Sequence, residues 1–269
     1  MKITFIGGGN MAQAIIGGLI ATGQPATACF AVEPHDVARE KLSALGIASI
    51  ASWSERGLDA EVIVLAVKPQ MMKEAIAPLH AKLRSQLVIS IAAGIRTQDL
   101  SRWLGNYNSI VRTMPNTPAL IHAGITGLYA LPAVSAAQRA AAENLMAAVG
   151  KTVWFDDEAM LDAVTAVSGS GPAYVFYMIE AMEAAALELG LEATVARTLA
   201  LETFLGSAKL AAQGGDAPAV LRANVTSKRG TTERAIESFE AADIKAAFVA
   251  GVRAAHARSL ELGEELGKN

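Results

Sequence analysis

The chain lacks several residue patterns that would mark common protein classes. Its 269 residues include one cysteine, four histidines and only 5% aromatic residues. A single cysteine excludes an internal disulfide and suits a reducing compartment, so we expect Cys29 to pack in a strand rather than act as a nucleophile. The histidines lack metal-ligand spacing, and neither a Gly-x-Ser-x-Gly elbow nor a P-loop occurs. We therefore expect no metal site and a chemistry that depends on an organic cofactor.

Charge and hydropathy argue against two kinds of partner. The net charge is -3 and no basic run occurs, so nucleic acid is not expected. No apolar run approaches the ~18 residues needed to span a bilayer, and the first residues read as a strand rather than a signal peptide. We expect a cytoplasmic protein with no membrane partner. An apolar fraction of 52% is ample for a core, and the length favours two domains.

The first half of the chain alternates between strand-like and helix-like patterns. Alternation of this kind predicts a parallel sheet with helices on both faces, which is the α/β architecture of a Rossmann domain. Apolar runs predict strands at 2–6, 28–32, 47–50, 62–67, 87–91, 109–113, 125–130 and 151–155. Helical patterns lie between them at 10–22, 36–45, 70–83, 97–104 and 135–148.

After residue 156 the pattern becomes helical throughout. Helices are predicted from Pro172 to Gly190, over 192–213, and from Asp243, which is a good N-cap, towards the end of the chain. We therefore predict a dinucleotide-binding domain over 1–156 and an all-α domain over 157–269. A small helical domain with many apolar stripes buries them poorly alone, so we expect a homodimer built on it. Packing of these helices on the first domain alone is the alternative.

The most informative segment is the glycine turn after the first strand. It reads Gly7-Gly8-Gly9-Asn10-Met11-Ala12 and leads directly into a helix. In a dinucleotide site, the first glycine makes the tight turn, the next allows close approach of a pyrophosphate, and a small third residue lets helix and strand pack. The amides that begin the helix then face negative charge. An ordinary glycine-rich turn is the alternative.

Distinctive residues also follow the carboxyl ends of later strands, where a Rossmann domain binds its ligand. Glu33 ends the second strand and could accept hydrogen bonds from an adenosine ribose, or simply precede a helix at Pro34. The other segments could each be an ordinary turn, but three at one sheet edge favour a site. They are Ala66-Val67-Lys68-Pro69, Ala92-Ala93-Gly94 and the loop Met114–Pro118 with Asn116.

One segment of the helical half is unusual, running from Asn224 to Thr232. Free amides around Gly230, Thr231 and Thr232 would suit a carboxylate at a helix start. Alternatively Thr226 or Ser227 caps that helix and nothing more is implied. From the residues alone the capped helix is the simpler interpretation.

Five separated segments resemble the pyrroline-5-carboxylate reductase family nearly end to end. They are Gly7–Met11, Ala66–Gln70, Val111–Pro118, Ser168–Tyr174 and Val225–Thr232. The resemblance implies a Rossmann domain joined to a helical domain that interlocks two subunits, sometimes in a larger ring of dimers. It also implies hydride transfer from NADPH or NADH to the C=N bond of 1-pyrroline-5-carboxylate, giving L-proline in the last step of proline biosynthesis.

The resemblance also implies roles for single residues. Gly7, Gly8, Gly9, Asn10 and Met11 would hold the cofactor pyrophosphate, and Ala66 to Pro69 with Ala92 to Gly94 would line the cofactor. Ser227 and the amides near Thr231 would hold the substrate carboxylate, and Thr232 would face the ring nitrogen. One departure is Arg229, where the family usually has a small residue, often glycine. A glycine there could adopt positive φ, which arginine resists.

Two other functions remain open from the sequence. β-Hydroxyacid dehydrogenases also join a Rossmann domain to a helical one, but they carry a lysine on the first long helix of the second domain. Here no lysine occurs between Lys151 and Lys209. A non-catalytic dinucleotide sensor would explain the glycine turn but not the whole 225–232 segment.

Overall fold

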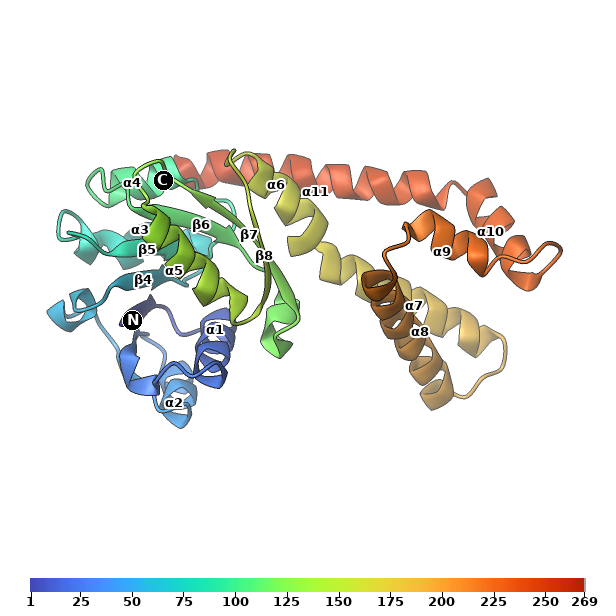
Figure 1. Ribbon diagram of the computed structural model, residues 1–269, viewed down its shortest axis with the longest axis horizontal. Helices are drawn as coiled ribbons and strands as arrows, with labels where there is room; N and C mark the ends of the chain where they lie inside the picture. The colour runs from blue at the N-terminus through green and yellow to red at the C-terminus, as the bar shows by residue number, and fades with distance from the viewer. Residues whose placement is uncertain (269) are drawn as a thin grey trace. The chain divides into compact units, whose positions relative to one another are not determined.

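The structure is a computed structural model that describes residues 1–268, and it divides into two compact units (Figure 1). The first unit comprises Met1–Ser170 together with Ala255–Asn269, and the second comprises Gly171–Ala254. The chain thus enters the helical unit and returns to the first unit at its end. The domain boundary at residue 156 stays a prediction.

The first unit is built on an eight-stranded sheet in the order β3-β2-β1-β4-β5-β6-β7-β8. Strands β1 to β6 are parallel, and their order reverses between β1 and β4 as in a doubly wound Rossmann sheet. The predicted fold is therefore confirmed. The strands are β1 Ile3–Ile6, β2 Cys29–Val32, β3 Ala48–Ile50, β4 Val62–Leu65, β5 Leu87–Ser90, β6 Ile110–Met114, β7 Gly124–Ala130 and β8 Gly150–Trp154.

The last strand pair departs from the parallel arrangement. β7 runs antiparallel to β6, whereas β8 is parallel to β7. The reason lies in the connections. Only a short segment with the 3₁₀ turn Thr117–Ile121 joins β6 to β7, while helix α5, Ala136–Ala147, joins β7 to β8. A parallel pair needs a long crossover, usually a helix, and only the second connection supplies one.

Two apolar cores cover the two faces of the sheet. Strand β4 shows how one strand serves both, because Val62 and Val64 belong to one core and Ile63 and Leu65 to the other. Side chains alternate between faces along a strand, so a strand buried on both sides is apolar throughout. Helices α1, Asn10–Ala21, and α5 contribute to the first core. Helices α3, Met72–Ile76, and α4, Thr97–Trp103, contribute to the second.

The other α-helix between β1 and β8 is α2, Asp36–Ala44. Its position and those of α1, α4 and α5 agree with the predictions to within about two residues. The predicted helix 70–83 is shorter and irregular: α3 lies between 3₁₀ turns at Pro69–Met71 and Ala77–Leu79. Pro69 and Pro78 lack the amide hydrogen that an α-helix needs, and each lies in one of these turns.

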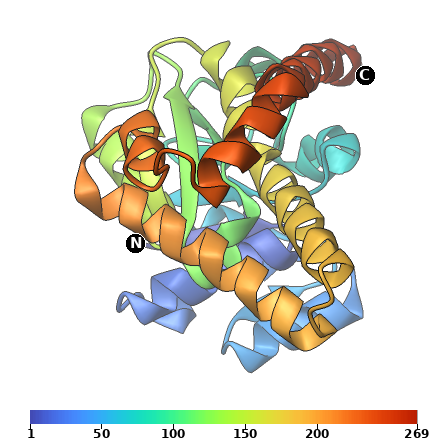
Figure 2. The same cartoon turned by 90° about the vertical axis from the view of Figure 1, so that its right-hand side faces the viewer.

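The second unit, over its described residues, contains helices and no strand (Figure 2). Its helices are α7 Gly171–Glu188, α8 Ala193–Gly214, α9 Pro218–Asn224, α10 Thr231–Ala241 and the first part of α11, Ile244–Gly267. The short helix α9 was not predicted. Asp243 precedes α11 as expected, but with φ of 52° it is left-handed rather than extended as an N-cap usually is. Across residues 1–268 no helix is long and apolar enough to cross a membrane.

Helix α7 begins at Gly171, so Pro172 lies in its first turn as predicted. Helix α6, Met160–Val164, and a π-helical turn, Thr165–Gly169, directly precede it and were not predicted. The wide turn is closed by a hydrogen bond of 2.8 Å from Ser170 N to Thr165 O. π-turns of this kind frequently occur at functional sites.

Candidate functional site

The three glycines of the turn after β1 are required for different physical reasons. Gly7 has a φ of 99°, and a Cβ on it would lie 2.5 Å from Ala66 O. A Cβ on Gly8 would lie 2.6 Å from Leu42 Cδ1. Gly9, in contrast, has an extended backbone and nothing within 4 Å of where its Cβ would be. Packing inside the protein therefore explains Gly7 and Gly8, whereas only open space, available to a ligand, lies beside Gly9.

The amino end of helix α1 is open in the same way. Gly9 is its N-cap and no side chain caps the helix. The first amides of an α-helix have no partner within the helix, so they are free to bind an anion here, with the helix dipole behind them. Gln13 steadies the turn by donating from Nε2 to Gly8 O at 2.6 Å. Ala12 is 1% exposed, which fits the small residue expected at the helix–strand contact.

Glu33 follows β2 and turns its carboxylate towards the glycine turn. Gly8 N donates to Oε2 at 2.7 Å, and His35 N donates to Oε1 at 2.8 Å. The side chain therefore has a structural task that the sequence did not reveal. Each carboxylate oxygen can accept more than one hydrogen bond, so a contact with a ribose hydroxyl remains available.

Two further predicted segments follow on from the glycine turn along the edge of the sheet, because β4 pairs with β1 and β5 pairs with β4. Ala66 follows β4 and donates its amide to Ile6 O at 2.7 Å. Ile91, which leads into Ala92-Ala93-Gly94 after β5, donates to Leu65 O at 3.1 Å. Ala66, Val67 and Pro69 are half-buried and Lys68 is exposed, while Ala92 and Gly94 are buried and Ala93 is half-buried.

Asn116 lies in the loop after β6, and its side chain is largely used within the protein. Its Oδ1 accepts from Ile125 N at 3.0 Å, and its Nδ2 donates to Ser168 O at 3.2 Å. Ser168 belongs to the π-helical turn, so this turn helps to hold the loop that the sequence assigned to the cofactor. The structure thus brings together all the predicted cofactor segments of the first unit at the carboxyl ends of β1, β2, β4, β5 and β6.

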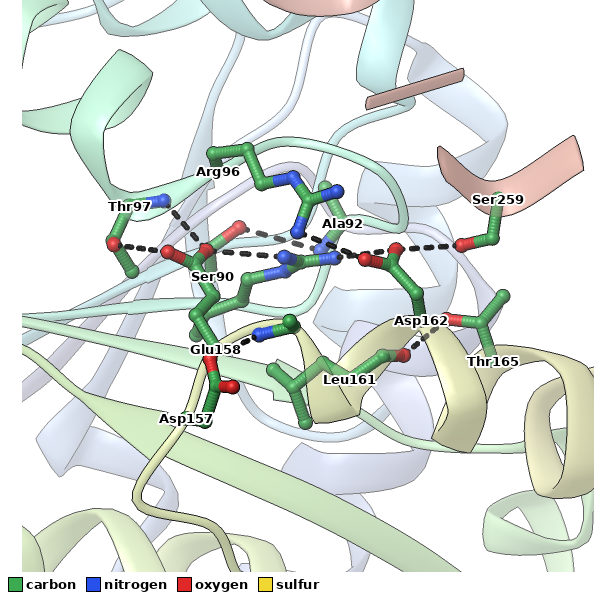
Figure 3. A network of polar contacts seen from close by, with 12 residues as sticks. Ser90, Ala92, Arg96, Thr97, Asp157, Glu158, Leu161, Asp162, Thr165 and Ser259 are labelled. Atoms are coloured by element: carbon green, nitrogen blue, oxygen red, sulfur yellow. Dashed lines mark hydrogen bonds and ion pairs between the residues drawn. The ribbon is translucent and has the colours of Figure 1, made fainter. Parts of the chain in front are cut away.

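Sequence reasoning missed a buried polar network close to these loops (Figure 3). Arg112 of β6 is 1% exposed and its Nη1 lies 3.0 Å from Glu158 Oε1. Asp162 of α6 is 0% exposed, with its Oδ2 2.8 Å from Arg96 Nη1 and its Oδ1 accepting from Ser259 Oγ at 2.8 Å. One signal was available: Arg112 is the one charged residue of the buried strand β6, and a buried charge needs a partner of opposite charge.

In the second unit, the 225–232 segment ends at the amino terminus of α10. Gly230 is the N-cap, and no side chain caps the helix. The expectation that Thr226 or Ser227 caps it was therefore wrong: Thr226 Oγ1 donates instead to Arg222 O of α9 at 2.6 Å. Ser227 turns back over the loop, so that a Cβ on Gly230 would lie 2.5 Å from Ser227 Oγ. The first amides of α10 are left without a side-chain cap, as a carboxylate site requires.

Arg229 adopts the positive φ that was expected of a glycine at this position. Its φ is 60°, in the left-handed region, and its amide donates to Glu233 Oε2 at 2.5 Å. Its side chain is exposed, and its guanidinium makes no hydrogen bond to any residue among 1–268. The loop therefore keeps its shape despite the arginine, at a conformational cost of about 1–2 kcal/mol.

Replacing Arg229 by glycine should leave the Michaelis constant for the substrate nearly unchanged. It should also raise the free energy of unfolding by roughly 0.5–1 kcal/mol, because glycine relieves the left-handed strain but adds freedom to the unfolded chain. Substrate kinetics and thermal unfolding would measure the two quantities. Lys228→Gly is the control, because Lys228 does not have a left-handed backbone that glycine could relieve. A rise in KM of tenfold or more, worth about 1.4 kcal/mol, would show instead that the guanidinium binds the substrate.

The doubly wound sheet, the glycine turn open at Gly9 and the uncapped amino end of α1 define a dinucleotide-binding protein of the Rossmann type. No group of three or more His, Cys, Asp or Glu residues in the described chain is placed to hold a metal ion. Cys29 is buried in β2, and its burial raises the pKa of the thiol, which disfavours the reactive thiolate.

Comparisons with known proteins cover both parts of the chain. A family model described as NADP oxidoreductase coenzyme F420-dependent matches residues 2–94, and one described as pyrroline-5-carboxylate reductase dimerisation matches residues 158–262. A pyrroline-5-carboxylate reductase of Pseudomonas aeruginosa is 49% identical and covers 99% of this chain and 98% of the relative.

Solved structures agree with these matches. A pyrroline-5-carboxylate reductase of Coxiella burnetii superimposes with a TM-score of 0.90 at 38% identity, covering 97% of this chain and 98% of that one. A pyrroline carboxylate reductase of Plasmodium falciparum with NADP bound has a TM-score of 0.87 at 27% identity, covering 98% of each. The chain belongs to the pyrroline-5-carboxylate reductase family. The resemblance inferred from five sequence segments is thereby confirmed, together with the expected NAD(P)H-dependent oxidoreductase class.

Proposed function

We propose that this protein reduces 1-pyrroline-5-carboxylate to L-proline with NADPH or NADH, the last step of proline biosynthesis. The observation that carries the proposal is the similarity to named pyrroline-5-carboxylate reductases over 99% of the chain. When bound, the reduced nicotinamide supplies a hydride to the carbon of the C=N bond. The open space beside Gly9 and the uncapped first turn of α1 fit the pyrophosphate of such a cofactor.

The residues of this chain take distinct parts in that reaction. Gly7, Gly8 and Gly9 with the amides of Asn10 and Met11 hold the pyrophosphate. The segments Ala66–Pro69 and Ala92–Gly94 line the rest of the cofactor. Asn116 contributes mainly by holding its own loop, since both ends of its amide already bond within the protein.

The substrate residues lie in the second unit. Ser227, Gly230 and Thr231 hold the substrate carboxylate, the latter two through amides at the uncapped start of α10. Thr232 is half-buried, and its hydroxyl makes no hydrogen bond to another residue among 1–268, so it is available for the ring nitrogen. No His, Asp or Glu occurs in 225–232. Because the imine can be protonated before it binds, a strong acid is not required there.

The test of this function separates three possible functions. Purified protein should oxidise NADPH or NADH in the presence of 1-pyrroline-5-carboxylate and form proline. It should not reduce NAD(P)⁺ with β-hydroxy acids, as a β-hydroxyacid dehydrogenase would. Cofactor binding without turnover of the imine would instead indicate a dinucleotide sensor.

Glu33 bears on the choice of cofactor. Its carboxylate lies at the turn where an adenosine ribose is expected and would repel a 2′-phosphate, which predicts that NADH is accepted. Glu33→Ser should shift the ratio of kcat/KM values towards NADPH by about tenfold, or roughly 1.4 kcal/mol. Glu33→Gln is the matched comparison. It removes the charge but keeps an oxygen for the Gly8 amide, so it tests the effect of the charge with the hydrogen bond to the glycine turn retained. If the ratio is unchanged in both variants, Glu33 serves the glycine turn only.

The second unit supports self-association. Its helices expose large apolar side chains, and α7, α9 and α10 contain no buried residue. These exposed side chains include Phe176, Tyr177, Leu199, Leu205, Leu210 and Phe239. Monomers rarely leave so much apolar surface in water. We therefore propose a homodimer formed through this unit, which its match to a dimerisation family supports; a ring of dimers is a further step of the same assembly.

Light scattering at low micromolar concentration should show at least a dimer. Leu205→Glu, on the exposed apolar surface of α8, should weaken the dimer. Val37→Glu, at an exposed position on α2, should leave the dimer unchanged. A stable, active monomer would contradict the proposal, and so would a dimer that only the Val37 variant disrupts.

We also infer a cytoplasmic location, which the single free cysteine supports.

A further inference from the structure

The loop from Ile91 to Thr97, which follows β5, is fastened at both ends. At its start, Ser90 Oγ accepts from Ala92 N at 3.3 Å, and Ser90 O accepts from Thr113 Oγ1 of β6 at 3.0 Å. At its end, Thr97 donates twice to Glu158, from N at 2.8 Å and from Oγ1 at 2.7 Å. This loop contains the Ala92–Gly94 segment, so its shape is set by residues from β6 and from the segment just before α6.

Asp162 also holds this loop in place, because it forms an ion pair with Arg96 of the loop. The Arg96 guanidinium and the Ser259 hydroxyl reach the two oxygens of this one carboxylate, each at 2.8 Å, from opposite sides in Figure 3. Ser259 belongs to the part of α11 that returns to the first unit. That part of α11 also lies beside the loop: a Cβ on Gly94, whose φ is 80°, would lie 3.0 Å from Leu266 Cδ1, so a side chain at position 94 would crowd α11.

The charges in this network balance. Two arginines, Arg96 and Arg112, face two carboxylates, Glu158 and Asp162, and Arg112 Nη2 lies 3.9 Å from Asp162 Oδ1. Buried ion pairs are weak contributors to stability compared with apolar packing of the same volume, but in some proteins they fix the position of the groups they join. Helix α6 moreover continues into the π-helical turn whose Ser168 O holds Asn116. One short helix is thus tied to both the β5 loop and the β6 loop.

We propose that Arg96 and Ser259, acting through Asp162, are positioning residues that hold the Ala92–Gly94 loop in the shape needed to bind the nicotinamide cofactor. The proposal rests on the proposed function, because it takes this loop as part of the cofactor site. A residue that positions a binding loop should change cofactor affinity more than it changes the rate at saturation.

Arg96→Gln is the main test variant, because the Arg96 side chain is 26% exposed and its loss leaves no cavity deep in the protein. Arg102→Gln is its matched control: Arg102 lies on α4, pairs with Asp99 and donates to Gly267 O of α11, but it does not contact Asp162. Ser259→Ala is the second test variant, and Arg258→Gln is its control, since Arg258 pairs only with the exposed Glu261 and Glu265. Asp162 itself is unsuitable because it is completely buried.

Fluorescence titration of NADPH binding, together with steady-state kinetics, tests the positioning role of these residues. Arg96→Gln should raise the Kd and the KM for NADPH by about tenfold while kcat at saturating cofactor stays within about twofold. Arg96→Lys, which keeps the charge, should recover part of the affinity, and Ser259→Ala should show a smaller rise. The two control variants should bind NADPH as the unchanged protein does.

Three results would overturn the inference. Unchanged NADPH affinity in folded Arg96→Gln and Ser259→Ala would do so, as would an equal loss in Arg102→Gln, which would indicate docking of α11 in general. A loss of kcat without a change in NADPH affinity would contradict it as well. Failure of the proposed function looks different, because the unchanged protein would then not bind NADPH or would not reduce 1-pyrroline-5-carboxylate.

Discussion

Gly9→Val should abolish NAD(P)H binding while the chain still folds. Gly9 has φ of -68° and ψ of -177°, an extended conformation that valine adopts readily, and no atom lies within 4 Å of its Cβ position. The new side chain would therefore meet no part of the protein, but it would fill the space before the amides of α1. We expect the Kd for NADPH to rise at least about a hundredfold, or roughly 2.7 kcal/mol.

Gly17→Val is the matched control for this experiment. Gly17 lies on the same helix and also has open space where its Cβ would be. It should therefore tolerate the same substitution and keep its affinity for the cofactor. Fluorescence titration and thermal unfolding of both variants would separate loss of the site from loss of the fold. Normal affinity in Gly9→Val would show that the pyrophosphate does not approach this turn.

Thr232→Ala should lower kcat by roughly ten- to a thousandfold, a range that brackets the loss of one aligned hydrogen bond and of the orientation it provides. Hydride addition raises electron density on the ring nitrogen. The Thr232 hydroxyl can accept a hydrogen bond from the iminium N–H or donate one to the amine product. NADPH affinity should hardly change, because Thr232 is assigned to the substrate alone.

Two variants control this result. Thr232→Ser keeps the hydroxyl and should recover most of the rate. Thr231→Ala should stay close to the unchanged protein, because Thr231 is proposed to act through its backbone amide at the start of α10. Steady-state kinetics with saturating NADPH would measure all three. Full activity in Thr232→Ala would show that another group or water serves the nitrogen.

The Rossmann part was largely predictable because its signals are local. Strand β4 is apolar at every position, and the glycine turn stands between β1 and α1, so hydrophobic pattern and turn chemistry agree. The antiparallel β7 and the shortened α3 were less visible. The antiparallel β7 depends on the length of a connection. The shortening of α3 follows from Pro69, just before the predicted helix, and Pro78 within it, which lie in 3₁₀ turns.

The candidate site was predictable in position but not in its support. The cofactor segments follow strand ends, and strand ends can be read from the sequence. The distant partners of Glu33, Asn116 and Asp162 could not be read in this way, because Gly8, Ser168 and Ser259 lie 25, 52 and 97 positions away in the sequence. Pairing of this kind is a property of tertiary structure. Only Arg112, the one charged residue of the buried strand β6, indicated that a buried partner existed.

The most direct test follows deuterium from the cofactor into the product. The purified protein would be given 1-pyrroline-5-carboxylate and NADPH carrying deuterium at both C4 positions of the nicotinamide, and the product analysed by mass spectrometry and NMR. The account predicts L-proline with one deuterium at C5, formed in step with NADPH oxidation and lost in Gly9→Val. Proline without deuterium, or NADPH oxidation without proline, would contradict it.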